Sequence, residues 1–395
     1  MVKLTAIRKE KIKEALFFEK GFYIDKGNGG RTMKKVFFTS ESVTSGHPDK
    51  ICDLIADSIL DAAIAGDKES HMAVEATIKD DFILVYGEAN TKADIDYEGI
   101  AKRVLKEIGY EEEYQVLVKV NKQSAEIDSA VAHDSISAGD QGIMFGYACD
   151  ETENYMPLAI DTAHALARKL EEVRRASNGL LKPDGKTQVT VEYVDGEPKR
   201  IDAIVISTQH AAELSQEALK EMMMNEVVLT TVDPKWLDEN TRYLINPSGS
   251  FVVGGSFGDS GTTGRKIVVD TYGGTAPIGG GCFSSKDPTK VDRSAAYYAR
   301  YVCRSLVEAK LCRKCQIQLS YAIGVAQPIS VLVEPFGTAT VSEEELNAIV
   351  ARNFDFSVEN IIKELDLRRP IYASTVNYGH FGKSYLPWEQ AKTLK

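Results

Sequence analysis

Three segments of the sequence group cations and carboxylates beside glycine-rich turns or at the start of predicted helices. In the first, His47, Asp49 and Lys50 surround Pro48, which fits the first helical position because its missing N–H costs nothing there. A helix N-terminus presents free N–H groups and a partial positive charge, so it could receive an anion. Asp49 could equally be a first-turn carboxylate that complements the helix dipole, and the spacing alone leaves both interpretations open.

The second segment spans residues 258–266 and ends in two adjacent cations, Arg265 and Lys266. The planar guanidinium of arginine and the point charge of lysine together suit a phosphate chain. In isolation, two such cations more often lie at the solvated end of a strand, here before the apolar run that begins at Ile267. The nearby Asp259 favours a cleft of mixed charge.

The third segment begins with three consecutive glycines and contains Lys286 and Asp292. It has the outline of a P-loop but fails the motif, which requires Gly where Ser285 stands and Ser or Thr where Asp287 stands. A carboxylate beside lysines at a helix start is nevertheless typical of sites that hold Mg²⁺ with polyphosphate. Asp292 as a plain N-cap residue is the competing interpretation.

Three other acids stand at less specific positions. Asp184 precedes a glycine and Lys186 at the opening of a predicted strand, where these residues alone indicate only a turn. Glu75 lies within one predicted strand and Glu88 just past the next, and acids are disfavoured in strands. Exposure at a sheet edge would explain both glutamates.

The elements that must bring these segments together predict an α+β protein. Apolar residues three or four apart indicate helices at 48–64, 94–108, 158–176, 211–224, 292–310 and 343–352. Strand patterns flank turns at 80–81 and 195–196, and two later strands follow, giving strands at 73–78, 82–86, 187–193, 201–207, 316–322 and 329–333. Antiparallel pairs separated by helices favour sheets covered on one face over a doubly wound parallel sheet.

Composition excludes several classes of protein. The 395 residues carry 47 Lys and Arg against 58 Asp and Glu, a net charge of −11, so we expect no nucleic-acid partner. No stretch reaches the roughly 18 apolar residues of a membrane span, so we expect no membrane partner. Any anion site in such an acidic chain must gather its cations locally.

The cysteines and the N-terminal extension indicate an unexported protein. Six cysteines are too sparse for a disulfide scaffold and no export signal precedes them, so we expect a cytoplasmic location. Cys312 and Cys315 have CxxC spacing, but one pair cannot complete four metal ligands, and two structural thiols are the simpler interpretation. Residues 1–32 precede Met33, and we interpret them as a translated leader that the native protein lacks.

Seven longer strings carry a family resemblance that covers the chain from Lys34 to its end. They are FTSESVTSGHPDKICD at 38, GDQGIMFGYA at 139, INPSGSFVVGG at 245, GDSGTTGRKIVVDTYGG at 258, GGGCFSSKDPTKVDRSAAY at 279, SYAIGVAQP at 320 and YGHFGKSYLPWE at 378. In this order and at this length they resemble the S-adenosylmethionine synthetase (methionine adenosyltransferase) family. Several ordered strings are highly specific, whereas a single one would be only moderately so.

The resemblance implies a fold and a reaction. The fold would be α+β, with three similar subdomains at 33–132, 136–253 and 255–392, each a mixed sheet with helices on one face. The methionine sulfur would attack the ribose 5′ carbon of ATP to give S-adenosylmethionine, and the departing triphosphate would be hydrolysed to phosphate and diphosphate. The protein would be a homodimer or homotetramer with active sites between subunits.

The resemblance also implies roles for individual residues. The catalytic residues would be His47, Lys186, Arg265 and Lys286. ATP would be bound by His47, Asp184, Lys186, Ser250, Phe251, Asp259, Arg265, Lys266, Cys282 and Lys286. Methionine would be bound by Glu88, Gln123, Asp140, Asp259 and Lys290. Two Mg²⁺ per active site would be held by Asp49 and Asp292, and K⁺ by Glu75.

Two alternatives and two departures from the family pattern stand beside this interpretation. A Mg²⁺-dependent kinase or ATPase would use the same cations but attack phosphorus, although Walker and kinase signatures are missing. A catalytically silent nucleotide-binding subunit is the other alternative. Ser285 and Ala125 stand where many family members have Gly and Pro, and residues 123–140, a gate in the family, are a few residues short, which puts gating in doubt.

Overall fold

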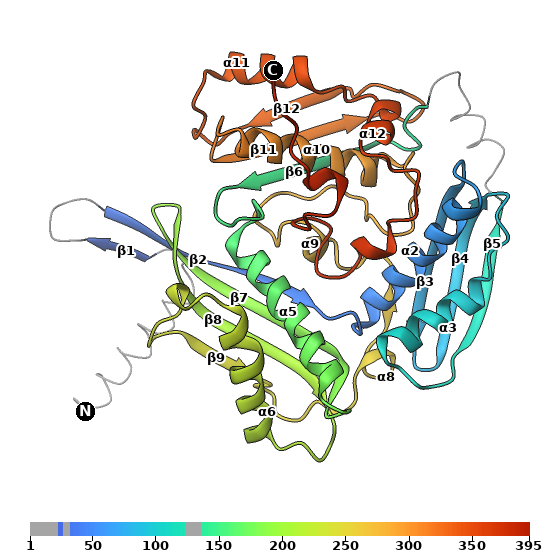
Figure 1. The fold of residues 1–395 in the computed structure, drawn as a ribbon, viewed down its shortest axis with the longest axis vertical. Coiled ribbons are helices and arrows are strands. Elements are labelled where there is room, and N and C mark those ends of the chain that lie inside the picture. The colour runs from blue at the N-terminus through green and yellow to red at the C-terminus, as the bar shows by residue number, and fades with distance from the viewer. Residues whose placement is uncertain (1–22, 27–31, 123–135) are drawn as a thin grey trace, which may run out of the picture.

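The computed structural model describes residues 23–26, 32–122 and 136–395, and three β-sheets form its framework (Figure 1). The strands are β1 (Tyr23–Lys26), β2 (Thr32–Val43), β3 (His71–Lys79), β4 (Phe82–Asn90), β5 (Gln115–Asn121), β6 (Gly142–Cys149), β7 (Leu181–Val194), β8 (Glu197–His210), β9 (Arg242–Ile245), β10 (Gly261–Thr262), β11 (Lys314–Tyr321) and β12 (Ser330–Glu334). Their orders are β1-β2-β7-β8-β9, β10-β3-β4-β5 and β12-β11-β6. The first two sheets mix antiparallel pairs with one parallel pair each, β8–β9 and β4–β5.

Each sheet takes a strand from a distant part of the chain. β2 pairs with β7, with Val43 opposite Lys186. β6 pairs with β11, and the short β10 pairs with β3. The segments predicted to carry chemistry therefore approach one another through strand pairing.

Helices cover one face of each sheet, as the sequence predicted. α5 packs on β2 and β7, α2 and α3 lie over the second sheet, and α10 packs on β6 and β11. The α-helices are α2 (Pro48–Gly66), α3 (Tyr97–Ile108), α5 (Leu158–Ala176), α6 (Gln216–Met222), α7 (Leu229–Thr231), α8 (Gly255–Gly258), α9 (Ile267–Asp270), α10 (Val291–Glu308), α11 (Glu343–Asn353) and α12 (Val358–Glu364). A π-helix, η1 (Met223–Val228), and the 3₁₀ turns η2 (Pro234–Trp236), η3 (Ala373–Thr375) and η4 (Pro387–Glu389) complete them.

Local predictions are mostly confirmed, with three corrections. Both predicted hairpins form, and the turn between β7 and β8 has left-handed backbone at Asp195 and Gly196, with φ of 53° and 85°. The helix expected at 211–224 begins only at Gln216, after its N-cap Ser215, and continues as η1. The run after Lys266 is the short helix α9, so the strand-end interpretation of Arg265 was wrong. Glu88 lies inside β4 rather than past its end.

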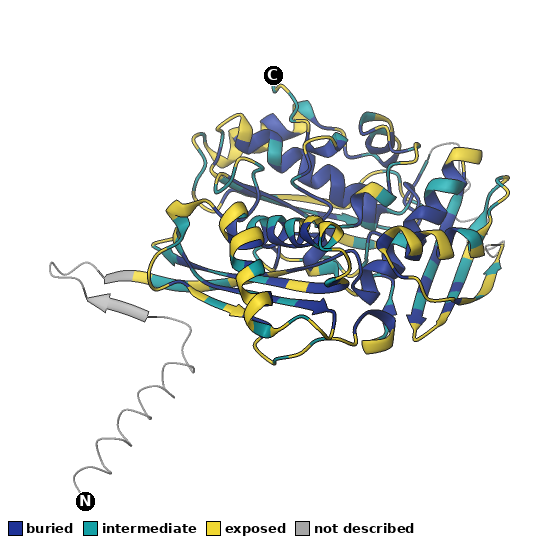
Figure 2. Cartoon of the chain, turned by 60° about the horizontal axis from the view of Figure 1, so that its bottom comes forward, coloured by how far each residue is buried: buried dark blue, intermediate teal, exposed yellow. Residues whose placement is uncertain are grey.

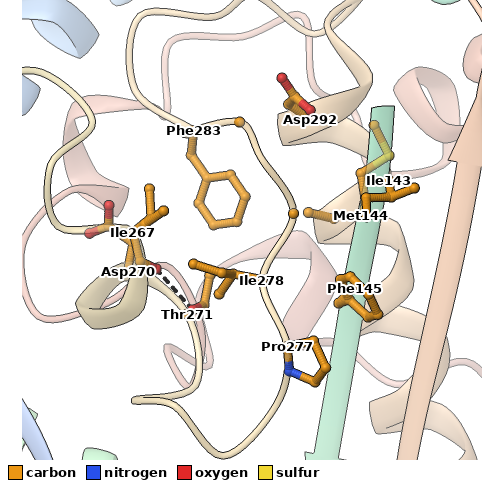
Figure 3. A pocket seen from close by; sticks show the side chains of 13 residues that line it. Ile143, Met144, Phe145, Ile267, Asp270, Thr271, Pro277, Ile278, Phe283 and Asp292 are labelled. Carbon is orange, nitrogen blue, oxygen red and sulfur yellow. Dashed lines mark hydrogen bonds between the residues drawn. The ribbon is translucent and has the colours of Figure 1, made fainter. Parts of the chain in front are cut away.

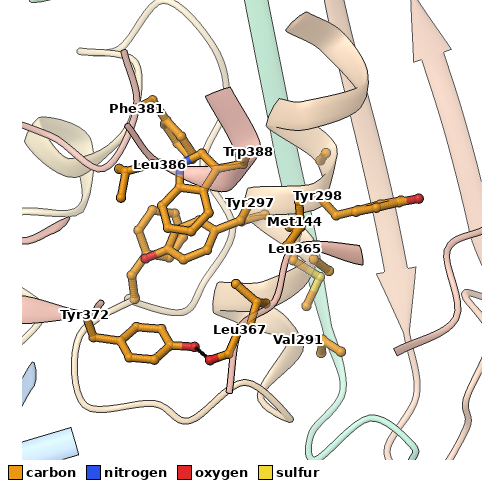
Figure 4. Packing of buried hydrophobic residues seen from close by; sticks show 14 of the residues in the cluster. Met144, Val291, Tyr297, Tyr298, Leu365, Leu367, Tyr372, Phe381, Leu386 and Trp388 are labelled. Atoms are coloured by element: carbon orange, nitrogen blue, oxygen red, sulfur yellow. Dashed lines mark hydrogen bonds between the residues drawn. The ribbon is translucent and has the colours of Figure 1, made fainter. Parts of the chain in front are cut away.

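The cores lie between the sheets and their helices, where buried residues concentrate (Figure 2). One cluster packs α5 against the first sheet, and a larger one joins the other two sheets. In the larger cluster the rings of Tyr297 and Trp388 stack 3.8 Å apart, between α10 and the C-terminal segment (Figure 4). Among the described residues, no helix has the length and apolarity to cross a membrane.

Candidate active site

The N-terminus of α2 forms one wall of the candidate site. His47 is the N-cap residue and Pro48 the first helical residue, as predicted. The Asp49 N–H donates to His47 Nδ1 at 3.2 Å, which leaves the proton of a neutral imidazole on Nε2. The turn before the helix lies close to two distant residues. The Tyr110 hydroxyl donates to the Gly46 carbonyl at 2.7 Å, and Gly46 approaches Pro183 so closely that a Cβ built on it would lie 2.4 Å away.

Asp49 joins the first predicted segment to the second. Its carboxylate lies 2.5 Å from Lys266 Nζ and 3.4 Å from Arg265 Nε, and it accepts the Thr262 N–H at 3.0 Å. Asp49 is only 1% exposed. It therefore stands in the first helical turn and is also the shared partner of both cations, while its role as a site residue stays a prediction.

Lys50 is not part of this cluster, although it stands beside His47 and Asp49 in the sequence. It is buried, and its Nζ lies 2.6 Å from Asp270 and 3.0 Å from Asp53. The charges of these carboxylates outweigh the effect of burial, and the pKa of Lys50 is raised. Lys50 is a structural cation of the core below the site.

The third segment meets the second sheet at Ala73, which forms a bridge with Lys286. The Lys286 ammonium forms an ion pair with Asp292. The N-cap residue of α10 is Lys290, so the interpretation of Asp292 as the N-cap was wrong. Ser285, where the family pattern has Gly, has φ of 83°, a left-handed conformation that is strained for any residue with a side chain.

Glycines let this loop lie close to Asp292. A Cβ built on Gly281 would lie 2.0 Å from the Asp292 carboxylate. Figure 3 shows the loop that carries Pro277 and Phe283 running between α9 and β6. The cavity beside it measures about 20 Å³, which is room for about one water molecule, so it is not a substrate pocket.

Burial and nearby cations keep His47 neutral. Burial, followed by the charges of Lys266 and Lys186, lowers the pKa of His47 to about 3. Lys186 is exposed on β7, two residues after the buried Asp184. Burial raises the pKa of Asp184 to about 6, although its carboxylate accepts the Gly255 N–H at 2.9 Å.

The remaining ATP candidates differ in their surroundings. Cys282 packs against Gly264, where a built Cβ would lie 2.7 Å from its sulfur, and burial raises the pKa of this thiol to about 11. The half-buried Phe251 donates its N–H to His210 Nε2 at 3.1 Å. Ser250 and Asp259 are exposed.

The methionine and K⁺ candidates lie farther along the second and third sheets. Glu75 accepts a hydrogen bond from the Tyr86 hydroxyl at 3.0 Å, and Glu88 is exposed in register with Ala73. Both are on inner strands, so edge exposure does not explain them. Lys290 lies 3.3 Å from Asp287, and Asp140 is exposed in the turn that leads into β6. Gln123 and most of the 123–140 gate lie outside the described residues.

The structure thus brings His47, Asp49, Arg265 and Lys266 together, and separately pairs Lys286 with Asp292. The sequence missed Tyr110 and Pro183, which lie close to the turn before α2 and have no motif to reveal them. It also missed the carboxylates of α2 beyond Asp49, although their spacing of four residues is visible in the sequence.

Comparison with known proteins shows to which protein family this chain belongs. Family models for the N-terminal, central and C-terminal domains of S-adenosylmethionine synthetase match residues 35–135, 135–251 and 253–390. The chain belongs to the S-adenosylmethionine synthetase family. An S-adenosylmethionine synthase of Finegoldia magna is 48% identical over 389 residues, which cover 92% of this chain and 99% of that relative.

Membership of the S-adenosylmethionine synthetase family settles the reaction class. The chain is a methionine adenosyltransferase that makes S-adenosylmethionine, as the motifs predicted. Its substrates are ATP and methionine, and the family uses metal ions. The kinase or ATPase alternative has no support in these matches.

Proposed function

We propose that the triphosphate of ATP lies at the N-terminus of α2, among His47, Lys186, Arg265, Lys266 and Lys286. The observation that carries this proposal is the meeting of both cations of the second segment at Asp49, beside His47. In a chain with a net charge of −11, Arg265 and Lys266 lie together at Asp49, which supports an anion site built from locally gathered cations.

Asp49 and Asp292 fit the role of Mg²⁺ ligands. Both are carboxylates, the donors that Mg²⁺ prefers, and each is paired with a lysine that could turn to phosphate instead. Within residues 23–26, 32–122 and 136–395, no three His, Cys, Asp or Glu side chains group as a metal site. This suits Mg²⁺, which usually takes one or two carboxylates and completes its shell with water and substrate phosphates. Bound there, two Mg²⁺ would neutralise charge on the triphosphate.

Glu75 is the K⁺ ligand in this proposal, and two groups of residues receive the organic parts of the substrates. Phe251 would stack on adenine, with Asp184, Ser250 and Cys282 near the nucleoside. Glu88, Gln123, Asp140, Asp259 and Lys290 would face methionine. The exposure of Glu88, Asp140 and Asp259 supports this, because a ligand can reach them.

The chemistry needs charge stabilisation rather than a base. The methionine sulfur has no proton to lose, so the neutral His47 would act as a hydrogen-bond donor to an oxygen of the departing triphosphate. Carboxylates near the sulfur favour the sulfonium cation over the neutral thioether, and stabilise the transition state more than the substrate. Alignment of both substrates removes much of the entropic barrier.

We propose a homodimer or homotetramer with active sites between subunits. Exposed apolar side chains on two sheets support the association of subunits. Phe82 and Leu117 on the second sheet, and Ile143 and Leu332 on the third, are large apolar side chains that are each more than 40% exposed. Exposed apolar residues grouped on sheets mark association surfaces. The proposed location of the protein is the cytoplasm.

One turnover experiment tests the function. The protein is incubated with ATP, L-methionine, Mg²⁺ and K⁺, and the products are identified by mass spectrometry. We expect the adenosyl sulfonium product, and strongly reduced turnover for Asp49→Asn with the fold intact. ADP without a sulfonium product would refute the transferase, no turnover would favour a silent subunit, and wild-type turnover of Asp49→Asn would remove Asp49 from the metal site.

A further inference from the structure

Helix α2 carries an aspartate at every fourth position, and each one accepts backbone N–H groups from the C-terminal third of the chain. We call Asp49, Asp53, Asp57 and Asp61 the aspartate ladder. Its bonds are Thr262 N–H to Asp49 at 3.0 Å, Gly264 N–H to Asp53 at 2.8 Å, Ser285 N–H to Asp57 at 3.0 Å, and Tyr372 and Ala373 N–H to Asp61 at 2.8 and 2.9 Å.

The spacing of the ladder sets the spacing of the loops. Four residues of α-helix rise about 6 Å and return to nearly the same face, so the aspartates form one row about 18 Å long. Asp49 and Asp53 bind the loop that ends in Arg265 and Lys266. Asp57 binds the strained Ser285, next to Lys286. Two loops with proposed phosphate ligands are thus fixed to the helix that carries Asp49.

Buried cations form ion pairs with the two middle aspartates, Asp53 and Asp57. Asp53 pairs with Lys50, which also pairs with Asp270 at the end of α9. Asp57 takes two hydrogen bonds from Arg293, at 2.8 and 2.5 Å, and Arg293 also donates to the Lys286 carbonyl at 3.1 Å. Each of these side chains is 1% exposed or less, except Asp270 at 2%. The two loops are therefore anchored by charged groups that are buried from solvent.

We propose that Asp53 and Asp57 are positioning residues that set the two phosphate loops relative to Asp49. Buried ion pairs add little net stability compared with apolar packing, so stability alone does not explain this row of charges. Fixed geometry does explain it, because a carboxylate that accepts a backbone N–H fixes the backbone of the loop, and so fixes the point from which the loop's cationic side chains extend. The inference rests on the triphosphate site proposed above.

Asp53 is the rung to test, because Lys50 keeps Asp270 as a partner when Asp53 is removed. Asp61 is the matched control: it has the same spacing and the same kind of bonds, but holds Tyr372 and Ala373, which are not in the proposed site. The probe is the β,γ-imido analogue of ATP with Mg²⁺, its affinity measured by calorimetry. Urea unfolding of each ligand-free variant gives stability separately.

We expect Asp53→Ala to weaken binding of the analogue about tenfold. Asp53→Asn should restore part of it, because the amide oxygen still accepts the Gly264 N–H although the amide NH₂ then faces the Lys50 ammonium. Asp61→Ala should lose stability but bind normally. If Asp53→Ala does not fold, Asp53→Glu replaces it; this change keeps the charge but displaces the loop, so it should also weaken binding.

Lys266→Ala separates this inference from the proposed site. If Lys266→Ala weakens binding and Asp53→Ala does not, the positioning role is refuted and the triphosphate site stands. Equal losses of affinity in Asp53→Ala and Asp61→Ala would show a general structural effect and also refute the inference. If Lys266→Ala binds as tightly as the wild type, the proposed triphosphate site fails, and the inference fails with it.

Discussion

A single methyl group at Gly46 should test whether the approach of α2 to β7 controls catalysis. Gly46 does not have positive φ, so alanine can adopt its backbone conformation. Its Cβ, however, would lie 2.4 Å from the backbone carbon and oxygen of Pro183. Ordinary contact begins at 3.4 Å, so the two segments must separate by 3.4 − 2.4, or about 1 Å.

That separation acts on the site directly, because His47 follows Gly46 and Asp184 follows Pro183 in the chain. A displacement of about 1 Å in a catalytic arrangement can cost about 100-fold in rate, which is about 2.7 kcal/mol of transition-state stabilisation. Overpacking should also lower the free energy of unfolding by about 1–3 kcal/mol. We therefore expect Gly46→Ala to fold and to lose about 100-fold in kcat/KM.

Gly66→Ala is the matched control, because Gly66 ends the same helix and its Cβ would lie 2.7 Å from the Cβ of Ala93. This variant should lose similar stability and keep its turnover. Steady-state kinetics with ATP and methionine, together with urea unfolding, measure both quantities. The reasoning is refuted if Gly46→Ala keeps kcat/KM within threefold of the wild type, or if Gly66→Ala loses as much activity.

Three other predictions concern pH dependence, adenine and the C-terminal segment. Because the pKa of Asp184 is raised to about 6 in the folded protein, its contribution to stability is full below about pH 4 and is lost as the pH rises through 6. In urea unfolding, Asp184→Asn should abolish this loss, which totals about 3 kcal/mol. Phe251→Ala should raise the KM for ATP about 5- to 100-fold with little change in kcat, and Phe251→Tyr should restore it. Glu389→Gln weakens the buried pair with Arg300 and should cost about 3 kcal/mol by urea unfolding without changing the KM for ATP.

Local signals in the sequence were sufficient for single elements. The Asp-Gly pair at 195–196 predicts a tight hairpin because both residues tolerate positive φ, and both have it. Pro48 predicts the start of α2 for a similar reason, since its ring fits the first helical position. The α-helical period at 211–224 did not predict η1, because side-chain spacing reports the exposed and buried faces and not the hydrogen-bond pattern.

Partners across the chain could not be predicted in this way. β2 lies beside β7 although more than 130 residues separate them. The sequence of neither strand predicts which strand it pairs with. Lys50 shows the same limit at the site: its neighbour Asp49 pairs with Lys266, but the Lys50 side chain pairs with Asp270, which is also far along the chain. The resemblance to a known family predicted the fold and the site residues, which the pattern of single elements could not do.

Charge balance explains how an acidic chain can hold so many cations close together. Lys266 and Arg265 share Asp49, and Lys286 has Asp292, so these cations of the proposed triphosphate site already have carboxylate partners. This pairing limits the repulsion among them before any substrate arrives. It also means that a triphosphate must compete with these carboxylates for the lysines, unless the carboxylates gain a cation of their own. If Asp49 and Asp292 bind Mg²⁺ as proposed, their lysine partners would be released to the triphosphate, and tight binding of the nucleotide would then depend on the divalent metal.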